Sequence, residues 1–196
     1  MIRGVLFDIG GVLETTPSTR WQARWESELG LAPGTIDERL ADVYRAGTTG
    51  AVTEAEIVAT VRRALTGRAE ALLDDLWDEY LGEADVPLQR YFAGLRPRYR
   101  TGILSNSWVG AREREHARYG YGDRCDVVVY SHEEGMMKPD PRFFELACAR
   151  LGVPPSAVVF LDDVRGHVEA ARALGMTAIH HVGTDESLAA LRAVLD

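Results

Sequence analysis

The stretch RGVLFDIGG, residues 3–11, decides how this chain folds. Its first seven residues form a short apolar run rich in β-strand formers, and the run ends at two glycines directly after Asp8 and Ile9. A run of this kind closed by a turn signal is typical of a buried strand that leads into a sharp turn. The sequence therefore predicts that Asp8 lies at the end of a strand.

Four further apolar runs predict four more strands. Helical patterns, with apolar residues three and four apart, separate them. Strands that alternate with helices imply an α/β fold in which helices flank both faces of a parallel sheet. The predicted strands cover residues 3–9, 99–105, 126–131, 157–161 and 177–182, and the predicted helices cover residues 86–95, 108–119, 141–151, 164–174 and 185–195.

Residues 14–85 break this alternation. They contain no convincing strand and several helical segments separated by glycine and proline. The segment holds 15 acidic and 7 basic residues, so it carries the whole excess of acid in a chain of net charge −8. We expect a core of residues 1–13 and 86–196 with a helical insertion of residues 14–85. The acidic excess indicates a solvated surface or a lid that disfavours highly anionic substrates.

The composition also excludes several classes of partner. A net charge of −8 would repel a nucleic-acid backbone or an anionic membrane surface, so neither is expected to bind. No apolar run approaches the ~18 residues that span a bilayer, and the first residues lack a cleavage signal. Cys125 and Cys148 have no zinc-site spacing, as expected of ordinary thiols in a reducing compartment. We expect a cytoplasmic protein and leave its oligomeric state open.

Polar residues follow the ends of the predicted strands, which is where ligands bind in open parallel sheets. Asp8 follows the first strand, and Ser105 and Asn106 follow the second. Asp162 and Asp163 follow the fourth. Three carboxylates in one place repel one another unless a hard cation lies between them. This set predicts a Mg²⁺ site at which a phosphate completes the coordination of the ion.

The single lysine of the chain, Lys138, falls in the loop after the third predicted strand. The other 21 basic residues are arginines, and a lysine is retained most readily where a compact ammonium is needed instead of a wide planar fork. With Mg²⁺ held by the carboxylates, Ser105 and Lys138 would donate to the remaining phosphate oxygens. Asp8 would then attack phosphorus in line as a nucleophile.

These residues lie in four motifs that resemble those of the haloacid dehalogenase superfamily. The motifs are LFDIGGVL around Asp8, ILSNS around Ser105, GMMKPDPRFFELA around Lys138 and VVFLDDVRGHVEAARALGM around Asp162 and Asp163. The resemblance covers essentially the whole chain. It implies a Rossmann-like core with a helical cap inserted after the first strand. Most members of the superfamily are phosphatases with an aspartyl-phosphate intermediate.

The resemblance also implies a role for each residue. Asp8 would be the nucleophile, Ser105 and Lys138 would bind the phosphate, and Asn106 would orient the substrate. The implied Mg²⁺ ligands are Asp8, the backbone carbonyl of Gly10, Asp162 and Asp163.

Two positions depart from the superfamily pattern. Its typical phosphatases carry a second Asp two residues after the nucleophile as the general acid and base, but this chain has Gly10 there, which cannot transfer a proton. Glu14, near the start of the insertion, is an alternative carboxylate for this step. The helix after the acidic pair carries His167 where Asn is usual, which implies a change in packing or in contacts around the site.

We therefore predict a Mg²⁺-dependent phosphatase that acts on a small phosphorylated metabolite. Two alternatives stay open: a phosphate-binding protein with little or no turnover, which Gly10 favours, and a metal-independent dehalogenase. The acidic pair argues against the dehalogenase, because halide-removing relatives have no metal and place other residues there. A lyase acting on phosphonates would need a Schiff-base lysine in the cap, and residues 14–85 contain none.

Overall fold

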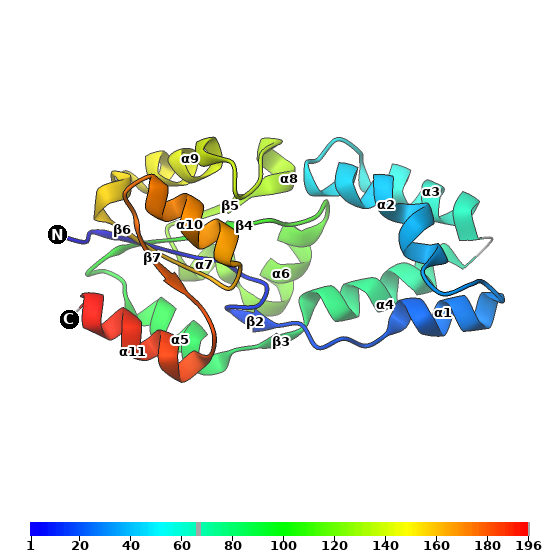
Figure 1. Ribbon diagram of the computed structural model, residues 1–196, viewed down its shortest axis with the longest axis horizontal. Coiled ribbons are helices and arrows are strands. Elements are labelled where there is room, and N and C mark those ends of the chain that lie inside the picture. The colour runs from blue at the N-terminus through cyan, green and yellow to red at the C-terminus, as the bar shows by residue number, and fades with distance from the viewer. Residues whose placement is uncertain (66–67, 196) are drawn as a thin grey trace.

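The computed structural model describes residues 1–65 and 68–195 (Figure 1). Its centre is a five-stranded sheet in the order β5-β4-β1-β6-β7. All neighbouring strands in this sheet run parallel, so the predicted α/β fold is confirmed. The strands are β1 (Gly4–Phe7), β4 (Arg100–Ser105), β5 (Val127–Tyr130), β6 (Val158–Asp162) and β7 (Thr177–His180).

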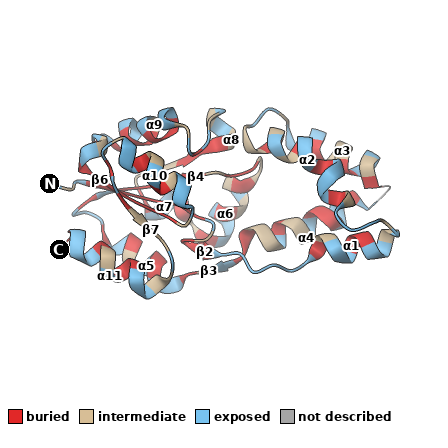
Figure 2. Ribbon diagram, viewed as in Figure 1, coloured by how far each residue is buried: buried red, intermediate tan, exposed pale blue. Residues whose placement is uncertain are grey.

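Helices cover both faces of the sheet, and the central strands β1 and β6 are therefore buried along their whole length (Figure 2). Val5 and Phe7 point into the apolar cluster formed with α5 (Val86–Gly94) and α11 (Thr184–Leu195), whereas Leu6 points into the cluster formed with α9 (Pro141–Leu151) and α10 (Arg165–Ala173). This alternation follows from the two-residue repeat of a strand. The helices of this half are α5 (Val86–Gly94), α6 (Ala111–Tyr119), α7 (Tyr121–Arg124), α8 (Ser131–Glu134), α9 (Pro141–Leu151), the 3₁₀ helix η1 (Pro155–Ala157), α10 (Arg165–Ala173) and α11 (Thr184–Leu195).

The helices described between residues 21 and 81 gather at the other end of the molecule, where they pack round a third apolar cluster (Figure 1). That cluster also takes in Trp108 and Ala111 from the sheet half. The described helices of this segment are α1 (Trp21–Leu29), α2 (Thr35–Thr48), α3 (Glu54–Leu65) and α4 (Ala69–Leu81). The division of the chain into core and insertion at these boundaries stays a prediction.

Two very short strands, β2 (Glu14–Thr15) and β3 (Glu83–Ala84), pair antiparallel where the chain enters and leaves this segment. The sequence predicted no strand here, because a two-residue strand is too short to show a periodic pattern. Their pairing joins the two ends of the helical segment at one place beside the sheet. No helix in the described ranges is long and apolar enough to cross a bilayer.

Candidate active site

Residues that the sequence placed at strand ends lie together in the structure. Asp8 directly follows β1, Ser105 is the last residue of β4, and Asp162 is the last residue of β6. Because β1 lies between β4 and β6 and all three run parallel, their carboxyl ends share one edge of the sheet. Lys138 reaches the same edge from the loop between α8 and α9.

The Lys138 side chain joins two of these carboxylates. Its Nζ lies 2.7 Å from Asp8 Oδ1 and 2.7 Å from Asp162 Oδ2. All three residues are buried, and a buried ammonium is stable only when it is paired and hydrogen-bonded. One positive charge therefore faces two carboxylates, which leaves an excess of negative charge for a further cation to offset.

Asn106 fixes the backbone of Lys138. Its Nδ2 donates to the Lys138 carbonyl at 2.9 Å, and its Oδ1 accepts from the Lys138 N–H at 2.8 Å. Both ends of the amide are thus occupied by the main chain of the lysine. The contact ties the loop after β4 to the loop before α9, two segments that are 32 residues apart in the chain.

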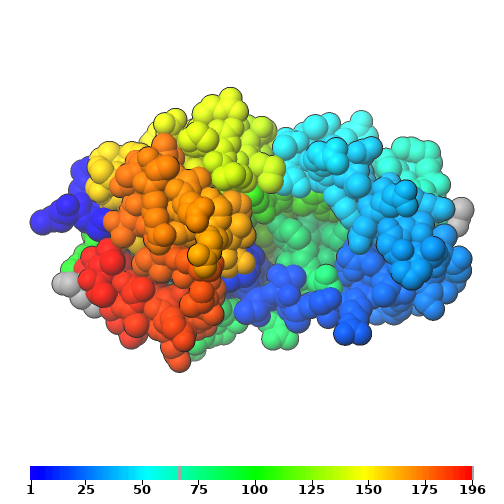
Figure 3. Space-filling model, in the orientation of Figure 1, coloured from blue at the N-terminus to red at the C-terminus, as the bar shows by residue number. Residues whose placement is uncertain are grey.

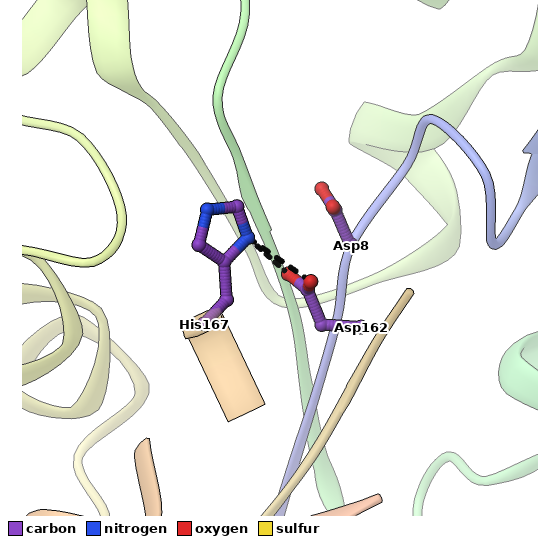
Figure 4. A group of neighbouring side chains, drawn as sticks. All are labelled: Asp8, Asp162 and His167. Carbon is purple, nitrogen blue, oxygen red and sulfur yellow. Dashed lines mark hydrogen bonds and ion pairs between the residues drawn. The ribbon is translucent and has the colours of Figure 1, made fainter. Parts of the chain in front are cut away.

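Asp162 is held on three sides. It accepts hydrogen bonds from the Val164 N–H at 2.8 Å and from Lys138, and its Oδ1 lies 3.0 Å from His167 Nδ1 (Figure 4). Burial by itself would raise the pKa of Asp162, but the hydrogen bond from His167 and the charge of Lys138 outweigh it, so the pKa is lowered. Asp162 is therefore an anion that anchors Lys138.

Asp8 lies in a different electrostatic position. Burial raises its pKa, Lys138 opposes that rise, and the neighbouring Asp162 carboxylate adds to it. Both hydrogen bonds that its carboxylate accepts, from Lys138 Nζ and from the Ile9 N–H at 2.8 Å, go to Oδ1. Among the described residues, no donor contacts the second oxygen, Oδ2.

Ligand atoms of Asp8, Asp162 and His167 lie within 4.8 Å of one another among the described residues (Figure 4). Two carboxylates with a single ammonium between them suit a hard, oxygen-preferring cation such as Mg²⁺. His167 uses Nδ1 to contact Asp162, so its role in this geometry is to orient that carboxylate.

Asp163 approaches the turn after β1. A Cβ built on Gly11 would stand 2.3 Å from Asp163 Oδ2, and Gly11 itself has a φ of +73°. Only glycine satisfies both conditions, because a side chain there would strain the backbone and collide with the carboxylate. Gly11 thereby lets Asp163 reach the backbone next to Gly10, the predicted carbonyl ligand.

Gly10 and Ser105 border a small cavity of about 110 Å³. The buried side chain of Glu14 lines the same cavity, and neither of its carboxyl oxygens has a hydrogen-bond partner among the described residues. Burial raises the pKa of Glu14 to about 9, and the neighbouring Glu115 adds to the effect. Glu14 therefore holds its proton more tightly than an exposed carboxyl does, and it lies in the cavity beside Gly10, where the resemblance implies a general acid.

Glu115 is a cavity residue that the sequence analysis did not identify. It accepts a hydrogen bond from Tyr130 Oη, and burial raises its pKa to about 7. The available signal was its place on α6, since Ala111, Glu115 and Tyr119 share the buried face four residues apart. A carboxylate on the apolar face of a helix predicts a buried polar contact. The sequence alone did not identify Tyr130 as the partner of Glu115, because the two residues lie on different elements.

The chain is similar to known proteins over most of its length. The family model for haloacid dehalogenase-like hydrolases matches residues 2–175. The D-ribitol-5-phosphate phosphatase of Bacteroides thetaiotaomicron is 28% identical, over 89% of this chain and 89% of that protein. The N-acetylmuramic acid 6-phosphate phosphatase of Pseudomonas aeruginosa is 30% identical, over 89% of this chain and 79% of that protein.

A longer relative matches over only part of its length. The bifunctional epoxide hydrolase 2 of Sus scrofa is 28% identical over 98% of this chain, and the match spans 39% of that protein.

Solved structures share the fold. A HAD family enzyme from Bacteroides thetaiotaomicron, in complex with magnesium and inorganic phosphate, superposes with a TM-score of 0.82 at 22% identity, over 96% of this chain and 99% of that one. A structure described as a predicted HAD-like family hydrolase from Porphyromonas gingivalis has a TM-score of 0.78 at 25% identity, over 100% of this chain and 99% of that one.

Proposed function

The chain belongs to the haloacid dehalogenase-like hydrolase family, and from that membership we propose that it is a Mg²⁺-dependent phosphatase of a small phosphorylated metabolite that acts through an aspartyl phosphate on Asp8. The observation that carries the proposal is the buried contact of Lys138 Nζ with Asp8 Oδ1 and Asp162 Oδ2, each at 2.7 Å. An ammonium in that position lowers the repulsion between a nucleophilic carboxylate and a phosphate.

The phosphoryl transfer uses the free oxygen of Asp8. Lys138 and the Ile9 N–H hold Oδ1, so Oδ2 forms the new bond to phosphorus while the bond from phosphorus to the leaving oxygen breaks. Ser105, which ends β4 beside Gly10, would donate to a phosphate oxygen. Asn106 contributes by holding the backbone of Lys138 in place.

The metal would be held by Asp8, Asp162, Asp163 and the backbone carbonyl of Gly10. Ligand atoms of Asp8 and Asp162 lie within 4.8 Å of each other, and His167 and Lys138 contact Asp162 and would orient it. When bound, Mg²⁺ supplies positive charge that offsets the repulsion between a phosphate and the carboxylates. Phosphatase relatives and the magnesium complex of a structurally similar enzyme support this assignment.

Glu14 is the proton carrier of the proposed mechanism, in place of the side chain that Gly10 lacks. It is protonated at neutral pH and shares a cavity with Gly10 and Ser105. In the first step the leaving oxygen takes the proton of the Glu14 carboxyl. In the second step the Glu14 carboxylate takes a proton from water, the water oxygen bonds to phosphorus, and Asp8 is released together with inorganic phosphate.

Residues 14–85 act in this proposal as a cap over the site, because α2 and α4 of that segment line a cavity together with the loop after β4. We also propose a cytoplasmic location, which the two buried free thiols, Cys125 and Cys148, support. Small phosphorylated molecules are the proposed partners. The net charge of −8 disfavours binding of a nucleic acid, because it repels the phosphate backbone.

A second candidate, a phosphate-binding protein without turnover, rests on Gly10 alone. Acid-quench trapping with a ³²P-labelled phosphomonoester separates the two. Label on Asp8 together with sustained phosphate release supports the enzyme, whereas binding without label or release supports the second candidate.

The proposed function is tested by phosphate release from a panel of phosphomonoesters, with Mg²⁺ and with excess chelator. The purified chain is compared with Asp8→Asn, which keeps the size of the side chain and removes the nucleophile. Mg²⁺-dependent release that Asp8→Asn abolishes supports the proposal. Equal activity of the two proteins, or full activity in chelator, contradicts it.

A further inference from the structure

A second cavity, of about 240 Å³, lies between the helical segment and the sheet half. Its lining residues are Tyr44 and Thr48 of α2, Leu76 and Tyr80 of α4, and residues 106–108 after β4. The space-filling view shows a hollow at the middle of the molecule, between the two halves (Figure 3). We call this cavity the aromatic pocket, because three of its lining side chains are aromatic.

The aromatic pocket adjoins the candidate active site. Tyr80 and Asn106 line both this pocket and the small cavity that contains Gly10 and Ser105. A phosphate bound at Ser105 would therefore direct its organic group toward the aromatic pocket. The lining of the pocket then determines which leaving group fits.

Aromatic contacts hold the wall of the pocket in place. Tyr44 meets the Trp108 ring edge-on, with centroids 5.8 Å apart, and Trp77 packs against Trp108 at 5.5 Å. Tyr80 in turn meets Trp77 edge-on at 5.1 Å. Edge-to-face pairs at these distances are favourable, so the rings form a pre-built apolar wall.

Hydrogen-bonding groups on the loop side of the pocket are already engaged within the protein. Asn106 bonds through both ends of its amide to the main chain of Lys138. Ser107 Oγ pairs with His132 Nδ1 at 2.7 Å. The indole N–H of Trp108 donates to a backbone carbonyl at 3.2 Å.

The side of the aromatic pocket formed by α2 and α4 offers few free hydrogen-bonding groups. Thr48 Oγ1 donates to the Tyr44 carbonyl at 3.0 Å, and the Tyr80 hydroxyl interacts with Glu115. Only the Tyr44 hydroxyl has no partner among the described residues, and a single hydroxyl can donate only one hydrogen bond. None of the lining residues carries a charge.

From these contacts we propose that the substrate is a phosphomonoester whose leaving group is uncharged and apolar, of one to two rings or a branched chain of that size. A polyol or a second anionic group would lose more hydration in the aromatic pocket than the few remaining hydroxyl lone pairs could replace, and no cationic side chain lines the pocket. An apolar cavity of about 150 Å³ holds benzene, so the volume of this pocket suits a group slightly larger than that. The proposal rests on the proposed phosphatase function.

The kinetic test compares benzyl phosphate and cyclohexylmethyl phosphate with ribitol 5-phosphate. All three release a primary alcohol, so differences in rate reflect the fit of the leaving group more than its chemistry. We expect kcat/KM for the two apolar esters to exceed that for ribitol 5-phosphate by about 10-fold or more. Equal values, or a preference for the polyol, overturn the proposal while leaving the phosphatase function intact.

The binding test does not depend on turnover. Benzylphosphonate and methylphosphonate carry the same phosphonate group, and we expect benzylphosphonate to bind at least about 10-fold more tightly when Kd is measured by ligand-observed NMR. Equal affinity overturns the proposal even if no ester is hydrolysed. Absence of hydrolysis of every ester, with benzylphosphonate still preferred, instead rejects the phosphatase function.

Two variants on α4 test whether the aromatic pocket causes the tighter binding of benzylphosphonate than of methylphosphonate. Leu76→Gln puts an amide on a pocket wall at nearly constant size, and it is expected to reduce the ratio of the two phosphonate affinities several-fold. Asp78→Gln changes an exposed residue two positions further along, outside the pocket lining, and is expected to leave that ratio unchanged. A ratio that both variants change equally, or that neither changes, contradicts the location.

Discussion

The carboxylate of Asp163 lies against the backbone of Gly11, so closely that a Cβ on Gly11 would stand 2.3 Å from Asp163 Oδ2. The two residues are far apart in the chain, and each follows a central strand, β6 and β1. Their contact brings the second carboxylate of the acidic pair to the turn after the nucleophile. The proposed metal site therefore depends on a glycine that is not itself a ligand.

Gly11→Ala is expected to displace Asp163 and to raise the Mg²⁺ concentration needed for half-maximal activity by at least about 10-fold. The positive φ of Gly11 adds a backbone cost of about 1–2 kcal/mol for a residue with a Cβ. Activity measured over a Mg²⁺ titration and thermal unfolding test the two effects. Gly10→Ala is the matched control for stability, because a Cβ there meets nothing within 4 Å. Equal changes in Tm for the two variants would contradict this account.

Lys138→Arg is expected to be nearly as inactive as Lys138→Ala, although it preserves the charge. Lys138 is 1% exposed, and its ammonium lies 2.7 Å from each of two carboxylates, so a wider planar guanidinium has no room between them. Lys138→Met removes the charge at similar volume, and unpairing a buried charge in this way typically costs about 3–5 kcal/mol. Steady-state rates and urea denaturation measure these outcomes. Retention of most activity by Lys138→Arg would refute the assignment of the lysine.

Glu14→Gln is expected to slow hydrolysis of the aspartyl phosphate more than its formation. An activated aryl phosphate would then give an initial burst and an accumulating phosphoenzyme, since a positioned acid or base contributes about 10²- to 10⁴-fold. Acid-quench labelling of Asp8 measures the intermediate. Glu115→Gln is the control, because Glu115 lines the same cavity but is bonded to Tyr130.

Gly10→Asp in the Glu14→Gln background is expected to restore part of the steady-state rate. Nothing lies within 4 Å of a Cβ at Gly10, so the first atom of the added side chain meets no clash. Rescue by the double variant identifies the missing function as proton transfer. If Glu14→Gln turns over like the wild type, the role of Glu14 in the mechanism is wrong.

Stability is expected to fall as pH rises from about 5 to 9, owing to Glu14 and Glu115. The folded protein raises their pKa values from 4.5 to about 9 and about 7, so each carboxyl holds its proton more tightly when folded. The contribution of each buried carboxyl to the free energy of unfolding is complete below the pKa of that group in the unfolded chain. It is lost as the pH rises through the pKa of the group in the folded protein. Glu14→Gln should flatten the decline by up to about 1.4 kcal/mol per pH unit in that window. Urea denaturation at pH 6, 7.5 and 9 measures the slope, and an unchanged slope would contradict the buried state of Glu14.

Local patterns in the sequence were enough to predict the parallel sheet and the positions of its strand-end residues. The central strands β1 and β6 are nearly continuous apolar runs, because both faces of the sheet are covered, and β4 carries a shorter apolar stretch before Ser105. Asp8, Ser105 and Asp162 could be located in this way, since each is the residue at or directly after the end of a strand. Their closeness followed from the rule that parallel strands share one carboxyl edge.

Long-range packing decided the remaining features of the site. Three contacts of the site join segments that no local sequence pattern connects. They are the hydrogen bonds of Asn106 with Lys138, the close approach of Asp163 to Gly11, and the proximity of Glu14 to Glu115. The aromatic pocket likewise needs α2, α4 and the loop after β4 to pack together. The sequence predicted which groups would react, because carboxylates and a hydroxyl stand at the ends of predicted strands and the single lysine follows in a nearby loop. The protonation of Glu14 and the apolar lining beside it come from burial, which exists only once distant segments enclose them.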